Sequence, residues 1–129
     1  MDDLKIPYLG VERPVIVIDD ELLTFKYNGE SFLVHRRYLE DLSTLAENWL
    51  RRQAAIYIPT RVRFLSTRVG ITKYKRIRIS NARSRWGSYS SKGTLSFNWR
   101  LIMAPVGVVD YVIVHELAHI VEMNHSRNF

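Results

Sequence analysis

Three of the four histidines of this chain, His115, His119 and His125, lie in its last fifteen residues, HELAHIVEMNHSRNF. The spacing His115-Glu116-x-x-His119 on a helix places two imidazoles on one face, one turn apart. Both rings can then bind one zinc ion, with Glu116 beside the water on the metal. His125 is expected as the third ligand, and the open fourth position is typical of a catalytic zinc site.

The alternative is that these are ordinary core histidines. The run from Val106 to His115 is apolar nearly all round, as in a buried helix. Burying His115, Glu116 and His119 there without a partner costs free energy, which a metal ion removes. The sequence therefore favours ligands. For His125 the open alternative is a solvent-exposed side chain, with water or another group as third ligand.

The end of this helix is predicted near Met123. The zincin pattern with this ligand spacing usually has a glycine three residues before the third histidine, where this chain has Glu122. Asn124 tolerates the left-handed backbone that ends helices. We therefore expect the chain to turn at Asn124, so that His125 swings back toward the metal.

Composition narrows the class of protein. A chain of 129 residues is long enough for one domain with a core. It has no cysteine, so a zinc site must use histidine and carboxylate ligands. No run of eighteen apolar residues predicts a membrane helix. The N-terminus, MDDLKIPYLG, does not resemble a secretory signal. A cytoplasmic location follows as the default.

Charge is distributed unevenly along the chain, whose net charge is +6. Residues 1–47 carry ten acids and five bases, whereas residues 48–109 carry thirteen bases and no acid. This basic block predicts attraction for a polyanion, either nucleic acid or a phosphorylated small molecule. The equally weighted alternative is that the bases spread over several surfaces and pair with the acidic first third.

Hydrophobic periodicity and turn residues predict the elements. Strands are expected at Val15–Ile18, Leu22–Tyr27 and Ser31–His35, the last two joined at Asn28-Gly29, with His35 a structural residue. A helix over Tyr38–Ile56 should break at Pro59, and a second helix should end at Gly70. The remaining elements are a strand at Lys75–Ser80, a hairpin of Ser84–Ser90 with Thr94–Arg100, and the metal helix that begins at Pro105. This order of strands and helices indicates an α+β domain.

Several motifs lie close together from Ser84 onward: SRWGSYSSKGTLSFNWRL, Pro105, DYVIVHELAH and Asn124-His125-Ser126. In combination they resemble the YgjP-like metal-dependent hydrolases, a bacterial family of zincin metallopeptidase-like proteins, from about residue 43 to the end. The resemblance implies three metal ligands and a catalytic acid/base, namely His115, His119 and His125 with Glu116. It also implies a minimal zincin fold, with a small sheet beside the metal helix. We expect one domain over residues 1–129, with an N-terminal β-hairpin region (1–37) and this minimal zincin-like core (38–129). In that core we expect a small, mainly antiparallel sheet with helices on one side.

Two features depart from this family. Tyr89 stands where the family usually has cysteine in its R-W-G-S-C-S motif. Family members also normally continue past the third ligand with an aromatic pair and a further helix, whereas this chain stops at Phe129. We therefore expect a truncated, at best weakly active chain that exposes apolar surface around the metal helix or covers it by self-association.

The expected function is that of a Zn²⁺-dependent, peptidase-like hydrolase acting on a peptide or protein. The alternatives are a metal-dependent hydrolase of a phosphorylated substrate such as a nucleotide, and a nucleic-acid-binding module with a vestigial metal site. An extended substrate could pair with the edge strand that carries Arg85-Trp86-Gly87-Ser88. Candidate substrate-binding residues are Arg83, Arg85, Trp86 and Ser88. The preferred interpretation of Trp86 and Trp99 is nevertheless hydrophobic core.

Overall fold

A computed structural model describes the backbone of residues 4–126 and the side chains of residues 4–123. The strands are β1 (Lys5–Tyr8), β2 (Val11–Ile18), β3 (Phe25–Tyr27), β4 (Phe32–His35), β5 (Arg76–Ser80), β6 (Gly87–Tyr89) and β7 (Thr94–Asn98). The helices are α1 (Leu42–Val69) and α2 (Val106–Ser126), and short 3-10 helices form η1 (Arg36–Asp41) and η2 (Trp99–Met103). The α+β class is confirmed. Within the described residues, no helix has the length and apolarity needed to span a bilayer.

Helix α1 runs without interruption past Pro59, so the predicted break into two helices is wrong. Its buried residues recur every fourth position on both sides of the proline: Ala46, Leu50, Ala54, Ile58, Val62 and Ser66. Packing of this continuous stripe outweighs the one backbone hydrogen bond that proline removes. The end at Gly70 is confirmed, because Gly70 adopts a left-handed backbone with φ of 73°.

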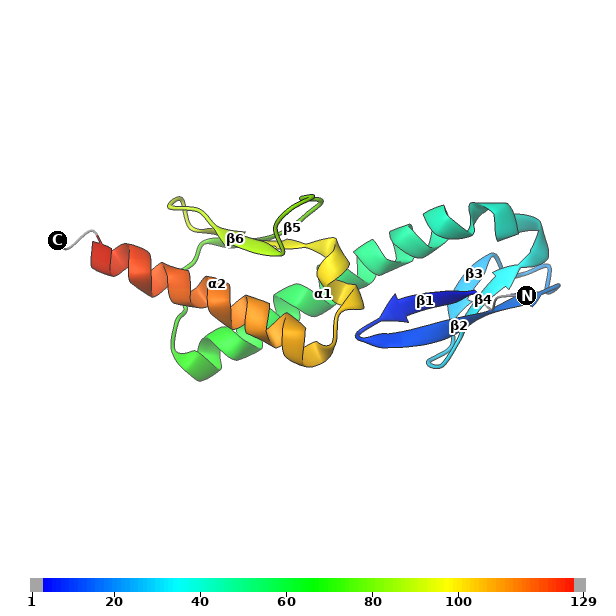
Figure 1. Cartoon of the computed structure of the whole chain (residues 1–129), viewed down its shortest axis with the longest axis horizontal. Coiled ribbons are helices and arrows are strands. Elements are labelled where there is room, and N and C mark those ends of the chain that lie inside the picture. Colours follow the sequence, from blue (N-terminus) through cyan, green and yellow to red (C-terminus); the bar gives the residue numbers. More distant parts are fainter. Residues whose placement is uncertain (1–3, 127–129) are drawn as a thin grey trace.

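The strands form two sheets, and both are mixed, so the mainly antiparallel character expected for the core sheet is not confirmed. Their orders are β1-β2-β4-β3 and β5-β7-β6. Both expected hairpins form, β3 with β4 and β6 with β7. Each hairpin, however, joins the preceding strand through its second strand, so β2 pairs with β4 and β5 with β7 in parallel. Figure 1 shows the two sheets beside opposite halves of α1.

The N-terminal sheet contacts the segment that leads into α2, the predicted metal helix. The two-residue turn Leu9-Gly10 has positive φ at both positions, 49° and 84°, as a hairpin turn of the primed type requires. Its amides donate to the carbonyls of Ile102 and Met103. A Cβ on Gly10 would lie 2.6 Å from Cα of Pro105, so only glycine allows this approach.

The C-terminal sheet covers α1 and α2 with one of its faces (Figure 1). Leu95 and Phe97 of β7 point to this inner side and are fully buried, together with Ile113 and Leu117 of α2. Alternation along the strands then turns Ser96 to the outer side. The sheet therefore separates the metal helix from a polar outer face.

An ion pair joins the two helices. Arg61 of α1 donates two hydrogen bonds of 2.7 Å to the carboxylate of Asp110 in α2. These hydrogen bonds raise the pKa of the Arg61 guanidinium above its ordinary value. Such a two-point contact fixes both distance and orientation between the helices.

Replacing Asp110 with Asn should lower the free energy of unfolding by about 1 kcal/mol, because the pair is bidentate but partly solvent-exposed. Urea unfolding would measure the loss. The control is Glu47→Gln, which removes an exposed Glu47–Arg51 pair within α1 and should cost at most about 0.5 kcal/mol. Equal losses in the two variants would contradict a special role for the interhelical pair.

Candidate metal centre

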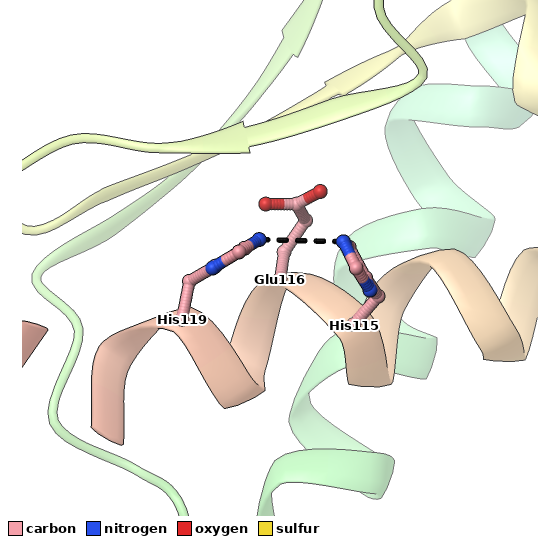
Figure 2. A group of neighbouring side chains, drawn as sticks. All are labelled: His115, Glu116 and His119. Carbon is pink, nitrogen blue, oxygen red and sulfur yellow. Dashed lines mark hydrogen bonds between the residues drawn. The ribbon is translucent and has the colours of Figure 1, made fainter. Parts of the chain in front are cut away.

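Helix α2 carries the two histidines that the sequence places one turn apart. Nε2 of His115 and Nε2 of His119 lie 3.3 Å from each other, and the ring planes are nearly perpendicular at 87°. Figure 2 shows the two rings pointing their tips toward one another, with the Glu116 carboxylate rising between them. The ligand atoms of the three side chains all lie within 4.8 Å of one another. One metal ion could therefore contact this group.

Glu116 is buried against the edge strand of the C-terminal sheet, with 7% of its surface exposed. A Cβ on Gly87 of β6 would lie 2.9 Å from Cγ of Glu116 and 3.2 Å from Phe97. The missing side chain of Gly87 is thus what makes room for the carboxylate. Within the described part of the chain, no hydrogen bond or ion pair occupies the Glu116 oxygens, so they are available to a ligand.

Further contacts on α2 orient the two imidazoles. Nδ1 of His119 lies 3.0 Å from a carboxylate oxygen of Glu122, one turn further along. This directs Nε2 of His119 toward Nε2 of His115, where it could bind a metal, and a carboxylate behind a ligand histidine usually has this orienting role. The ring of Tyr111 stacks on His115 at 6.0 Å between centroids. The residue that replaces the usual glycine, Glu122, therefore contributes to the site.

A hollow of about 260 Å³ lies beside this group. It is lined by Arg85, Trp86, Gly87, Tyr111, Val112, His115 and Glu116. Arg85 and Trp86 therefore lie beside the metal group, and their role in substrate binding stays a prediction. Trp86 is 54% exposed, so its assignment to the core is wrong. Trp99 is buried as expected. Ser88 lines hollows over the outer face of the sheet, and Arg83 lines none of these hollows.

Tyr89, at the position of the family cysteine, packs against the hydrophobic core from β6. Its neighbour across the sheet is Leu95. The residue therefore has a packing role here.

The predicted turn at Asn124 is wrong, because α2 continues to Ser126. Each further residue of a helix carries the backbone about 1.5 Å along the axis. The helix therefore does not reverse after Met123 as expected. The side chain of His125 lies outside the described residues, and its role as third ligand stays a prediction.

The outer surface of α2 exposes apolar side chains, among them Tyr111 at 69% and Val121 at 39%. Val106, Val108 and Val114 are exposed as well. Apolar surface around the metal helix was expected, whereas self-association through it stays a prediction.

Comparison with known proteins identifies the family. Residues 2–129 match the family described as YgjP-like, metallopeptidase domain. The chain belongs to this family. The match covers nearly the whole chain and includes the N-terminal sheet, beyond the residues that carried the resemblance. No curated protein and no solved structure matches this chain significantly. Family membership and the His115, Glu116 and His119 group together indicate a metal-dependent hydrolase.

Replacing Gly87 with Ala should disturb the centre, because the new methyl group meets Glu116 and Phe97 inside contact distance. We expect a loss of about 1–3 kcal/mol in the free energy of unfolding, as for other overpacked sites. The control is Gly107→Ala in the first turn of α2, where a Cβ meets nothing within 4 Å. That variant should be neutral or stabilised by up to about 1 kcal/mol. A Gly87→Ala protein as stable as the wild type would show that the close approach is unimportant.

Proposed function

We propose that this chain is a zinc-dependent hydrolase of the peptidase type, with Glu116 as the general base. The observation that carries the proposal is the convergence of two imidazole nitrogens beside a buried carboxylate at the edge of a sheet. A purely structural site has no use for that carboxylate, whereas hydrolysis needs a proton acceptor.

The donor set fits zinc. Two nitrogens bound tetrahedrally at 2.0–2.1 Å from one zinc ion would lie about 3.4 Å apart. The separation of 3.3 Å between the Nε2 atoms agrees with this value. His115 and His119 would hold the ion, and His125 is the proposed third ligand.

A zinc ion held there would supply a Lewis acid that makes water a nucleophile near neutral pH. The carboxylate of Glu116 accepts the proton of the attacking water. The water oxygen bonds to the carbonyl carbon, and the bond from that carbon to the leaving nitrogen breaks. Glu116 returns its proton to this nitrogen, which releases an amine and a carboxylic acid. The Glu116 carboxylate lies within 4.8 Å of the imidazole nitrogens that would hold the ion.

The free edge of β6 offers a place for an extended peptide. The amide of Asn98 donates to the carbonyl of Trp86, and the amide of Ser90 donates to the carbonyl of Thr94. By the alternation of antiparallel pairing, the backbone groups of Gly87 then point away from β7. The amide and carbonyl of Gly87 therefore lie at the free edge of the sheet, next to Glu116, and can pair with a substrate strand.

A phosphorylated substrate is the second candidate. Arg85 lines the hollow beside His115 and Glu116 and, within the described residues, makes no side-chain ion pair. A guanidinium in that place would suit a phosphate group. The nucleic-acid-binding module with a vestigial metal is less favoured, because such a module has no use for Glu116.

The test is zinc content and hydrolysis in the wild type and in Glu116→Gln. The wild type should bind one zinc per chain, measured by elemental analysis after zinc loading. Glu116→Gln should keep the zinc and lose about 10²–10⁴-fold in rate, because it removes only proton transfer. The control variant His115→Ala should lose the zinc. Casein and a nucleoside triphosphate panel as substrates would separate the two candidates. A wild type that takes up no zinc would overturn the proposal.

Glu122→Gln should weaken zinc binding by about 10–100-fold, the usual effect of removing a carboxylate behind a ligand histidine. Competition with a chromophoric chelator would measure the affinity. Glu47→Gln, which removes one exposed carboxylate from α1, should leave that affinity unchanged. An unchanged affinity in Glu122→Gln would mean that the contact to Nδ1 of His119 does not support the ligand.

A further inference from the structure

The outer face of the C-terminal sheet carries a row of arginine and hydroxyl side chains. Arg78 of β5 is in register with Ser96 of β7, which is in register with Ser88 of β6. The neighbouring row pairs Arg76 with Thr94. Because residues two apart share a face, all of these side chains project to the side opposite the helices.

These residues line a continuous shallow groove. One hollow of about 350 Å³ and another of about 460 Å³ lie over the sheet, and both are lined by Arg78, Arg85, Ser88 and Ser96. The rest of the lining consists of Arg76, Ser80, Asn81, Ala82, Gly87, Tyr89, Ser90 and Thr94. The lining therefore contains positive charge and hydrogen-bond donors but no acidic residue.

The arginines of this groove have no acidic partner. Within the described residues, Arg76, Arg78 and Arg85 make no ion pair, and their guanidinium groups donate no hydrogen bond inside the chain. Among the described acids of the first third, Asp19, Glu21 and Glu47 form ion pairs, and none of their partners belongs to the groove. The basic partner that lies furthest along the sequence is Arg51, which pairs with Glu47. Among the described residues, the acidic first third therefore leaves this face uncompensated.

We propose that this groove binds the phosphodiester backbone of single-stranded nucleic acid. Arginine and serine or threonine side chains are the usual donors to phosphate oxygens. A shallow groove suits an extended chain, whereas a single nucleotide is normally held in an enclosed, largely apolar pocket.

The groove goes beyond the proposed hydrolase activity and does not depend on it. Gly87 faces Glu116, whereas Ser88 lies in the outer row. Binding to the groove therefore needs no metal, and hydrolysis at the metal centre needs no nucleic acid. A binding assay tests the groove whether or not the chain proves to be a hydrolase.

The test compares two triple variants that remove the same amount of charge. The groove variant replaces Arg76, Arg78 and Arg85 with Gln. The control variant replaces three exposed arginines of α1 outside the groove, Arg52, Arg63 and Arg68, with Gln as well. Anisotropy of a fluorescent single-stranded oligonucleotide of roughly 12 nucleotides measures Kd over a range of salt. Three phosphate contacts predict a slope of log affinity against log salt of about −2.

The groove variant should lose about tenfold or more in affinity at low salt, together with most of that slope, whereas the control should stay within about twofold of the wild type. Equal losses in the two variants would overturn the proposal, because net charge alone would then explain binding. A wild type that does not bind at low salt would overturn it too. Full competition by a nucleoside triphosphate at the same phosphate concentration would show a site for small anions instead.

A second pair of variants covers the case in which the triple variant fails to fold. Ser88→Asp places a carboxylate in the lining that Ser88 shares with Arg78 and Arg85, and Ser88→Asn is its neutral control. Both lie at an edge strand, where polar substitutions are tolerated. Weaker binding by Ser88→Asp alone supports the groove, and equal binding by the two variants contradicts it.

Discussion

The metal centre depends on one close approach, that of the β6 backbone to the side chain of Glu116. At this point a Cβ would come within 2.9 Å of the carboxylate chain, and Gly87 has none. The register in which β6 pairs with β7 is therefore fixed both by the strand pairing and by the contact of Gly87 with Glu116 of α2. A slip by one residue would turn Trp86 or Ser88 toward α2, and neither fits. The arrangement of two imidazoles with a buried carboxylate is thus a consequence of sheet register as well as of helix spacing.

Helix α1 supports this arrangement because it contacts both halves of the molecule. Its N-terminal half packs through Trp49 against an aromatic cluster of the N-terminal sheet, which includes Tyr8 at 4.9 Å. Its C-terminal half is joined to α2 by Arg61 and Asp110. The fourfold-spaced buried stripe continues through Pro59. A break there would uncouple the two halves, so the continuity of α1 is what lets the Leu9-Gly10 turn and the metal helix share one core.

Local chemistry was predictable from the sequence, and pairings between distant segments were not. The turns at Asn28-Gly29 and Gly93, the cap at Gly70 and the helix after Pro105 follow from residues within a few positions of each other. By contrast, either strand of a hairpin can join a neighbouring strand, and hydrophobic alternation does not distinguish the two. Both parallel pairings arise from that choice. Pro59 was misjudged because tertiary packing, which a local rule ignores, outweighs its cost.

The same division holds for the site. The pairing of His115 with His119 follows from helical spacing, whereas the roles of Gly87 and Glu122 depend on what lies opposite them. Glu122 lies one turn beyond His119, so its contact could have been found from the i, i+3 rule. Gly87 lies nearly thirty residues before Glu116 in the sequence. Only the docking of β6 on α2 shows why a glycine must stand there. The exposure of Trp86 likewise follows from the position of β6 at a sheet edge.

The position of β6 also limits how the two faces of the C-terminal sheet can influence each other. The sheet is a single layer, and its inward and outward side chains alternate, so Gly87 and Tyr89 serve the metal side while Ser88 serves the outer side. Direct contact between the faces is therefore restricted to the free edge. Arg85 lies just before β6 and lines hollows on both sides. The charge of Arg85 can therefore act on a ligand of either face. Arg76 on β5, by contrast, lines the outer groove but not the hollow beside the metal centre. The edge of β6 is thus the point at which binding on the outer face and chemistry at the metal centre can be coupled.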